Sequence, residues 1–259
     1  MAGYGIIGFG RIGQRLASRL PGAVVLTRPA RLSEAEILAG RGKACVLFEE
    51  FVACKPAVAI ECASPQALKD FGPALLAAGI DLVPLSLTAL ADPATEQKLM
   101  AAAAAGPGRL EIAPGAIGTL DLLASAREAG LERVVYRQIK SPAMWKLTPA
   151  VAFADLAAVS ERRVFLKGSV RELATRLPDN LNSSVGVALA GLGLDATQVE
   201  LVADPAISQT AHELEIHSAP GKALLRLGGR DVTPDGDPVD YTTFSLLRLL
   251  RRRGAKVAI

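Results

Sequence analysis

The spacing of apolar residues divides the chain into two halves with different predicted structures. In the first half, short apolar runs alternate with stretches whose apolar residues recur at helical spacing. The runs that predict strands are residues 4–8, 23–27, 57–63, 81–86 and 109–113, and the predicted helices are residues 11–20, 65–78 and 93–105. Short apolar strands separated by helices pair in parallel through helical crossovers, so this half predicts a doubly wound parallel sheet.

The second half predicts an α+β domain with a mixed or antiparallel sheet. Its predicted strands are residues 132–140, 163–166, 198–203, 212–216 and 223–227, the last two as a hairpin. Its predicted helices are residues 119–129, 170–177 and 184–192, and a further helix, residues 241–253, follows near the end of the chain. An open sheet of this kind needs a cover, and a second copy of the chain is the usual one, so we expect a homodimer.

Both histidines of the chain lie in one stretch of alternating residues, 202–220. Successive side chains of a strand point to opposite faces. His212 therefore shares a face with Leu214 and Ile216 and points inward, whereas His217 lies on the polar face with the neighbouring glutamates and is expected to be solvated. The alternation alone leaves two interpretations of His212 open, a satisfied core histidine and a catalytic group.

Composition sets the class of protein. A chain of 259 residues, half of them hydrophobic, is long enough for one large domain or two ordinary ones. The net charge of +3 is mild, aromatic residues make up 4%, and basic runs are not interleaved with aromatics, which argues against a nucleic-acid partner. The sequence contains no uninterrupted run of about 18 apolar residues, so no membrane span is expected.

Cysteine usage and the N-terminus indicate the compartment. The chain has three cysteines, Cys45, Cys54 and Cys62. Because their number is odd and their spacing is not CxxC, neither a disulfide framework nor a metal site is expected. The first residues lack the charged leader and long apolar core of a signal peptide. We therefore expect a reduced, cytoplasmic setting.

A glycine-rich segment, GIIGFGRIG, follows the first predicted strand and opens a predicted helix. Gly8, Gly10 and Gly13 have the GxGxxG spacing that serves dinucleotide binding: the first permits a tight turn, the second lets the backbone approach a pyrophosphate, and the third lets the helix pack closely on the strand. The helix N-terminus offers amide donors to the anion. A tight turn without a ligand is the alternative. The residues expected at the cofactor here are Gly8, Phe9, Gly10, Arg11 and Ile12.

The end of the second predicted strand favours NADP over NAD. An acid at this point would bond the adenosine ribose of NAD, but the sequence VVLTRPAR offers Thr27, Arg28 and Arg31 instead. A hydroxyl and guanidinium groups suit a 2′-phosphate, which accepts charge-assisted hydrogen bonds. The alternative is that Arg28 stacks on adenine or faces solvent.

Over nearly its whole length the chain resembles the L-aspartate dehydrogenase family. The resemblance is carried by IECASPQALKDFGPALLAAGIDLVPLSLTALAD, by IAPGAIGTLDLL, by VFLKGSVRELATRLPDNLNSSVGVALAGLGLD and by VADPAISQTAHELEI. It implies an N-terminal Rossmann domain and an amino-acid dehydrogenase. In such an enzyme the amino acid is oxidised to its imine by hydride transfer to nicotinamide, and water converts the imine to an oxo acid and ammonia.

The resemblance also implies roles for single residues. His212 falls at the catalytic histidine, and an acid/base histidine suits both imine formation and imine hydrolysis. Lys140 could meet a substrate carboxylate, and Asn182 is a candidate for both cofactor and substrate contact. The remaining residues expected at the nicotinamide half of the cofactor are Ala63, Ser64, Ser86 and Ala116.

The expected domains follow from the same resemblance. Residues 1–113, joined by a returning helix in residues 238–259, would bind NAD(P), and residues 114–237 would form the catalytic and dimerisation domain. The chain departs from the family pattern at Pro114, Ser141, Ser183, Ser184 and residues 237–242. These changes keep two alternatives open: an NAD(P)H-dependent reductase of a different imine or oxo acid, and a dinucleotide-binding regulator without turnover.

Overall fold

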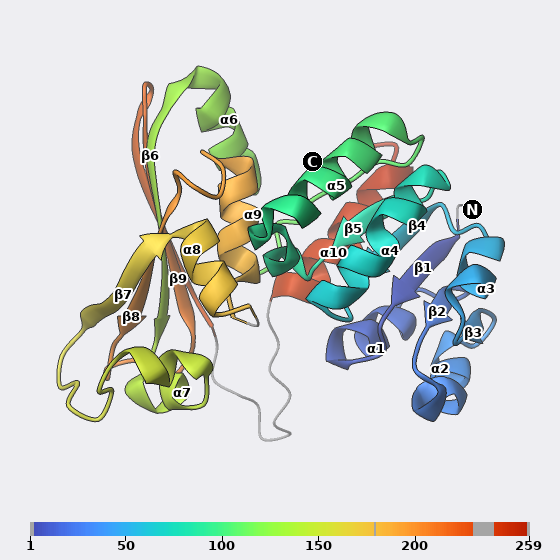
Figure 1. Cartoon of the computed structure of the whole chain (residues 1–259), viewed down its shortest axis with the longest axis horizontal. Helices are drawn as coiled ribbons and strands as arrows, with labels where there is room; N and C mark the ends of the chain where they lie inside the picture. Colours follow the sequence, from blue (N-terminus) through green and yellow to red (C-terminus); the bar gives the residue numbers. More distant parts are fainter. Residues whose placement is uncertain (1–2, 179, 230–240, 258–259) are drawn as a thin grey trace. The chain divides into compact units, whose positions relative to one another are not determined.

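The computed structural model describes residues 3–178, 180–229 and 241–257, which divide into two compact units (Figure 1). The first unit comprises residues 1–113 and 243–259, and the second comprises residues 114–242. The domain boundary expected at residues 237–238 lies outside the described residues. So do residues 237–240, which belong to the segment 237–242 that differs from the family pattern.

The first unit contains a parallel sheet in the order β3-β2-β1-β4-β5. Its strands are β1 (Tyr4–Ile7), β2 (Val24–Leu26), β3 (Lys43–Cys45), β4 (Val58–Glu61) and β5 (Asp81–Pro84). Each strand is almost wholly apolar because helices cover both faces of such a sheet. The strand order reverses at β1, and ligands of doubly wound sheets bind at this switch point, beyond the carboxyl ends of the strands. The predicted doubly wound fold is confirmed.

The helices of the first unit connect and flank these strands (Figure 1). They are α1 (Arg11–Ala17), η1 (Pro29–Arg31), α2 (Leu32–Ala39), α3 (Phe48–Ala53), α4 (Pro65–Ala77), η2 (Leu87–Ala91), α5 (Pro93–Ala105) and α10 (Tyr241–Gly254). Helix α10 adds Leu246 and Leu250 to the core beneath α1 and the central strands. Arg253, in its last turn, pairs with Asp81 at 2.6 Å and also with Glu111. The C-terminal helix is thus part of the first unit.

The prediction of a strand at residues 109–113 is wrong. Leu110 forms only an isolated bridge with Leu82 of β5, through hydrogen bonds of 2.8 and 2.9 Å. Proline lacks the N–H that a ladder needs, so Pro107 before this segment and Pro114 after it limit pairing to one bridge.

The second unit contains a mixed sheet in the order β10-β9-β6-β8-β7. Its strands are β6 (Leu131–Lys140), β7 (Arg163–Ser169), β8 (Gln198–Ala203), β9 (Ala211–Ser218) and β10 (Gly221–Gly228). β6 and β8 run parallel, and the other neighbours are antiparallel, including the predicted β9–β10 hairpin. The helices are α6 (Leu120–Gly130), α7 (Pro142–Lys146), η3 (Pro149–Phe153), α8 (Val170–Arg176) and α9 (Asn182–Ala190). The α+β prediction is confirmed.

The two faces of this sheet differ in chemistry. One face carries Tyr136, Leu214 and Ile216, all buried, and packs under α6 and α9. The opposite face carries charged residues, beginning with Arg137 and Glu200, whose Nε and Oε2 atoms lie 2.6 Å apart. Period-two alternation along β6 and β9 separates these sets because successive side chains point to opposite sides. Among the described residues, no helix has the length and apolar character needed to cross a membrane.

Candidate functional site

The glycine loop has the geometry that a dinucleotide requires. Gly8 has φ +102°, and a Cβ placed there would lie 2.8 Å from the backbone of Ala63. A Cβ on Gly13 would lie 2.2 Å from the carbonyl oxygen of Gly8. By contrast, a Cβ on Gly10 would meet no atom within 4 Å, and Gly10 is the N-cap of α1. The first and third glycines are therefore required by packing, while the second leaves open space beside amide donors, where a pyrophosphate fits.

The other loop residues contribute mainly through the backbone. The Phe9 side chain is 5% exposed and belongs to the core of the first unit. Its ring lies 5.4 Å from the guanidinium of Arg31, which also pairs with Glu34 at 2.7 Å. Arg11 is exposed at the first position of α1, and Ile12 is half-buried. The Phe9 side chain is thus unavailable to a ligand, and its peptide is what can reach the cofactor.

The carboxyl end of β2 presents one exposed cation beside a buried hydroxyl. Thr27 is 8% exposed, and its N–H donates to the Cys45 carbonyl at 2.9 Å. Arg28 is exposed and begins the turn into η1. Because Arg31 is committed to Glu34 and Phe9, Arg28 is the better placed guanidinium for a phosphate.

A buried carboxylate, Glu61, joins two loops at the carboxyl edge of the sheet. Glu61 is 1% exposed at the end of β4. Its Oε1 accepts from the N–H groups of Ala63 at 2.8 Å and Ser64 at 3.0 Å, and from the Ser86 hydroxyl at 2.9 Å; its Oε2 accepts from the Ser86 N–H at 3.1 Å. Burial raises the pKa of Glu61, and these hydrogen bonds oppose that rise. Glu61 thereby fixes the β4–α4 turn and the start of η2.

Glu61 was not among the residues predicted for the site, but the residues that it orders were. Ser86 is 7% exposed with its hydroxyl bonded to Glu61, and the Ser64 hydroxyl caps α4 by accepting from the Ala67 N–H at 3.1 Å. Their side chains are therefore already engaged within the protein. An acid at the end of the apolar run AVAIECA is the sequence signal that could have indicated Glu61.

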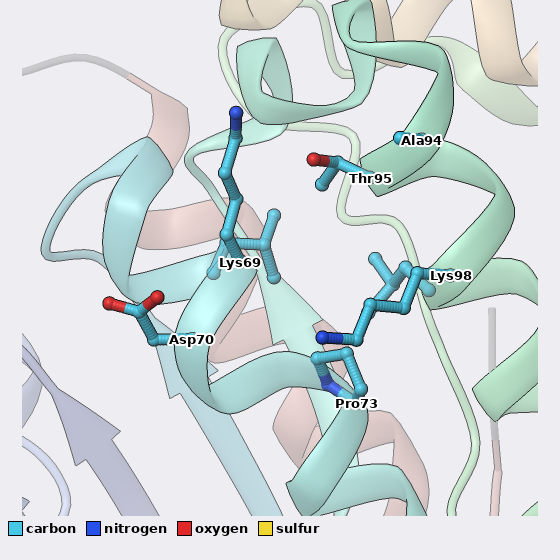
Figure 2. Close-up of a pocket in the computed structure, with 8 residues that line it drawn as sticks. Lys69, Asp70, Pro73, Ala94, Thr95 and Lys98 are labelled. Atoms are coloured by element: carbon cyan, nitrogen blue, oxygen red, sulfur yellow. The ribbon is translucent and has the colours of Figure 1, made fainter.

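A surface pocket between α4 and α5 lies apart from these loops (Figure 2). Its volume is about 230 Å³, and Lys69 at its rim pairs with Asp92 at 3.3 Å. The lining residues are Leu68, Lys69, Asp70, Pro73, Ala94, Thr95, Lys98 and Leu99. This lining includes no residue predicted to contact cofactor or substrate.

In the second unit, His212 is held by a buried tyrosine. His212 lies on β9, half-buried, on the same face as Leu214 and Ile216, as the alternation predicted. Its Nδ1 is 2.7 Å from the hydroxyl oxygen of Tyr136 on β6, and the two rings stack with centroids 5.9 Å apart. Tyr136 is fully buried, and the Ser183 side chain at the start of α9 hydrogen-bonds to it. His212 thus meets Tyr136 through Nδ1.

The environment of Tyr136 keeps its phenol protonated. Burial raises its pKa, and the hydrogen bond with Ser183 opposes that rise only in part. A neutral phenol offers one donor and an acceptor oxygen, so it can bond both His212 and Ser183. Neither Tyr136 nor Ser183 was predicted as a site residue from the sequence.

Lys140 and Gln138 extend the face of the sheet on which His212 and Tyr136 lie. They follow Tyr136 at intervals of two along β6, and Gln138 is paired directly with His212 in the β6–β9 register. The Lys140 ammonium lies 4.9 Å from the centre of the Trp145 ring, and burial lowers the pKa of Lys140. A partly desolvated ammonium next to an aromatic ring is suited to bind a carboxylate.

The remaining predicted residues of this unit lie at helix starts and turns. Asn182 is the first residue of α9, one position before Ser183, and Leu181 rather than Asn182 is the N-cap. Ala116 lies in a turn in which the Ile117 N–H donates to the Pro114 carbonyl at 3.3 Å. The turn leads into α6. The structure thus brings Tyr136, His212 and Ser183 together, with Gln138 beside His212.

The expectation of a solvated His217 is wrong. Its side chain is 22% exposed, and its Nε2 is 2.7 Å from the Glu215 carboxylate. Glu215 in turn pairs with Arg137 at 2.9 Å. Alternation placed His217 correctly on the polar face, but this face carries a network of ion pairs that takes the imidazole partly out of solvent.

Comparisons with known proteins relate both units to dehydrogenases. Residues 8–113 match the NAD-binding domain of homoserine dehydrogenase, and residues 121–253 match the C-terminal domain of aspartate dehydrogenase. The L-aspartate dehydrogenase of Serratia proteamaculans is 36% identical over 251 residues, 95% of each chain. That of Pseudomonas aeruginosa is 38% identical over 205 residues, 79% of this chain and 77% of the other. The crystal structure of aspartate dehydrogenase from Thermotoga maritima shares the fold, with a TM-score of 0.78 and 24% identity over 100% of this chain and 99% of the other.

Proposed function

The chain belongs to the L-aspartate dehydrogenase family of NAD(P)-dependent oxidoreductases, and we propose that it interconverts L-aspartate with oxaloacetate and ammonia by way of iminosuccinate. The observation that carries this proposal is the His212–Tyr136 pair on the inner face of the second unit. It provides an acid/base group on the same face of the sheet as Lys140, which suits an amino acid that also carries carboxylates.

His212 performs the proton transfers through Nε2. The aspartate ammonium must lose a proton before its carbon can give up a hydride, and Nε2 accepts it. A dinucleotide, when bound, supplies the hydride acceptor. His212 releases that proton to solvent before hydrolysis. It then takes a proton from the water that attacks the imine carbon, and it returns this proton to the departing nitrogen as ammonia leaves. In the opposite direction the same group works in reverse order.

Tyr136 serves this cycle by fixing the tautomer of His212. A histidine that acts as base through Nε2 carries its proton on Nδ1, and this N–H donates to the Tyr136 oxygen in both protonation states. The phenol is also hydrogen-bonded to the Ser183 side chain. The pair therefore stays hydrogen-bonded throughout, and only Nε2 changes its protonation.

Lys140 binds a carboxylate of the substrate in this proposal. Its ammonium is partly desolvated, as the lowered pKa indicates, so a carboxylate partner would restore the solvation that burial removes. Asn182, beside Ser183 at the start of α9, would contact the substrate or the nicotinamide part of the cofactor. Ala116 would contact the same part of the cofactor from its turn.

The dinucleotide would be held by the loops at the carboxyl edge of the first sheet. Gly10 and the amides that follow it would take the pyrophosphate, and Ala63 with the backbone ordered by Glu61 would approach the nicotinamide half. At the adenosine end Arg28 would meet a 2′-phosphate, and Thr27 lies beside it. We propose NADP as the preferred cofactor for this reason.

Arg28→Ala is expected to weaken NADPH binding far more than NADH binding. A charge-assisted phosphate contact contributes about 1.5–3 kcal/mol, and NADH lacks that phosphate. Fluorescence titration of both reduced cofactors measures the two dissociation constants. Arg41→Ala is the matched control, because Arg41 is exposed before β3, at the opposite end of the sheet. Equal affinity of the wild-type protein for NADPH and NADH would contradict the preference.

A second copy of the chain would cover the charged face of the second sheet. This face carries half-buried ion pairs such as Arg137–Glu215, and beside them Leu224 on β10 is 69% exposed. We expect a dimer in light scattering at micromolar concentration, and a monomer for Leu224→Asp, because a carboxylate next to Glu215 disfavours burial. A monomeric wild-type protein would exclude this interface.

The substrate is tested by incubating the protein with NADP⁺ and single amino acids. We expect L-aspartate to be oxidised fastest, with reduced cofactor, oxaloacetate and ammonia formed in equal amounts. L-glutamate, L-alanine and D-aspartate are the comparison substrates. Faster oxidation of another amino acid would show that the departures at Ser141, Ser183 and Ser184 have changed the specificity.

A further inference from the structure

Gln138 is a buried amide with an unsatisfied carbonyl. The residue is 7% exposed, and its Oε1 is buried without a hydrogen-bond partner among the described residues. Buried amide oxygens almost always have a partner, and a missing one lowers the stability of the fold. An unsatisfied polar atom at a candidate active site indicates a ligand that supplies the missing hydrogen bond.

The position of Gln138 identifies the ligand atom. Gln138 and His212 are directly paired in the β6–β9 register, so their side chains leave the same face of the sheet as close neighbours. Tyr136 already occupies Nδ1 of His212. A nitrogen that exchanges a proton with His212 therefore comes close to Gln138, where it can donate an N–H to Oε1.

We propose that Gln138 accepts an N–H of the reacting nitrogen, holds that nitrogen towards His212, and selects ammonia over alkylamines. The inference rests on the proposed function. An amine or ammonium nitrogen has N–H donors to spare, whereas a carboxylate has only acceptors and cannot satisfy Oε1. Lys140, two residues further along β6, is the group that suits the carboxylate.

Rotation of the Gln138 amide makes its oxygen accessible to the reacting nitrogen. Because Oε1 is buried, the 7% of Gln138 that remains exposed belongs to other atoms of the residue. The last torsion of a glutamine has a broad, two-fold profile, so the oxygen and the nitrogen of the amide exchange places at small cost. The oxygen can thus turn towards a nitrogen that arrives beside His212.

Nitrogen selection follows from the same contact. Ammonia can donate one N–H to Gln138 and still form two bonds to the substrate carbon. Methylamine would carry a methyl group into the space next to this buried amide, where it cannot donate. The wild-type protein is therefore expected to use ammonia and to discriminate against methylamine.

The test compares Gln138→Leu, which keeps the size but removes the acceptor, with Gln138→Ala, which also makes room. With oxaloacetate and NADPH, Gln138→Leu should raise KM for ammonia by about tenfold to a hundredfold, as expected for loss of a hydrogen bond to a charged or polar nitrogen. Its dissociation constant for NADPH should stay unchanged, and its Tm should be equal or higher, because an unsatisfied polar group has been removed. Gln138→Ala should gain activity with methylamine.

Gln198→Leu is the matched control, because Gln198 is exposed at the start of β8 in the same sheet. An unchanged KM for ammonia in Gln138→Leu, or a fall in its Tm, overturns the inference while the proposed function stands, provided that the wild-type protein turns over. A wild-type protein that does not turn over with oxaloacetate and ammonia overturns the proposed function and this inference with it.

Discussion

His212→Ala is expected to lower kcat by about 10²- to 10⁴-fold, the range that general acid–base assistance contributes. In the proposed mechanism Tyr136 holds Nδ1 at 2.7 Å, and Nε2 exchanges protons with the reacting nitrogen and with water. Cofactor affinity should be nearly unchanged, because the glycine loop and Glu61 lie in the first unit. Steady-state kinetics and NADPH titration measure both quantities.

His217→Ala is the internal control. His217 lies on the opposite face of the same strand and bonds Glu215, so its loss should leave kcat within about threefold, less than the tenfold that 1.4 kcal/mol represents. If His212→Ala turned over normally, or simply unfolded, the interpretation of His212 as a satisfied core histidine would be correct and another residue would have to supply the acid/base chemistry.

Glu61→Ala is expected to cause the largest loss of stability. It removes the acceptor of the Ala63, Ser64 and Ser86 N–H groups and of the Ser86 hydroxyl in a site that is 1% exposed. A donor left unsatisfied inside a protein costs about 1–3 kcal/mol, so the free energy of unfolding should fall by roughly 3 kcal/mol or more. The same loops would lose their order, so NADPH binding should weaken as well. Thermal unfolding and fluorescence titration measure the two effects.

Two further variants separate the causes of that loss. Glu61→Gln keeps one carbonyl acceptor and should show a smaller effect than Glu61→Ala. Glu36→Ala removes an exposed acid of α2 and should change neither stability nor affinity. Unchanged cofactor affinity in a folded Glu61→Ala protein would mean that the two loops do not depend on this carboxylate.

Hydrophobic periodicity predicted the longer helices and strands that have a clear pattern, and it missed several short ones. The helix at residues 93–105 and the strand at residues 198–203 have the predicted bounds, because their sequences carry a full period and clear terminal signals. Strand β3 (Lys43–Cys45) is only three residues long and acquires its structure by pairing with β2. Helices α2, α3 and α7 were likewise not predicted. Such segments are determined by tertiary contacts rather than by their own pattern.

The same limit applies to the candidate site. Alternation was sufficient to assign His212 to the inner face, since that assignment depends on neighbours in one strand. Tyr136 could not be identified in this way, because it lies 76 residues from His212 along the chain and meets it only through strand pairing. Glu61 was overlooked because its partners, among them Ser86 on the next loop, come together only in the folded sheet.

The most direct test of the central claim is the rate of NADPH oxidation by the wild-type protein with oxaloacetate, in the presence and absence of ammonia. An amino-acid dehydrogenase that uses His212 as proposed should oxidise NADPH only when both are present, and it should form L-aspartate. Oxidation without ammonia would indicate a reductase of an oxo acid. No oxidation under either condition, with tight NADPH binding, would indicate a dinucleotide-binding regulator and contradict the proposed function.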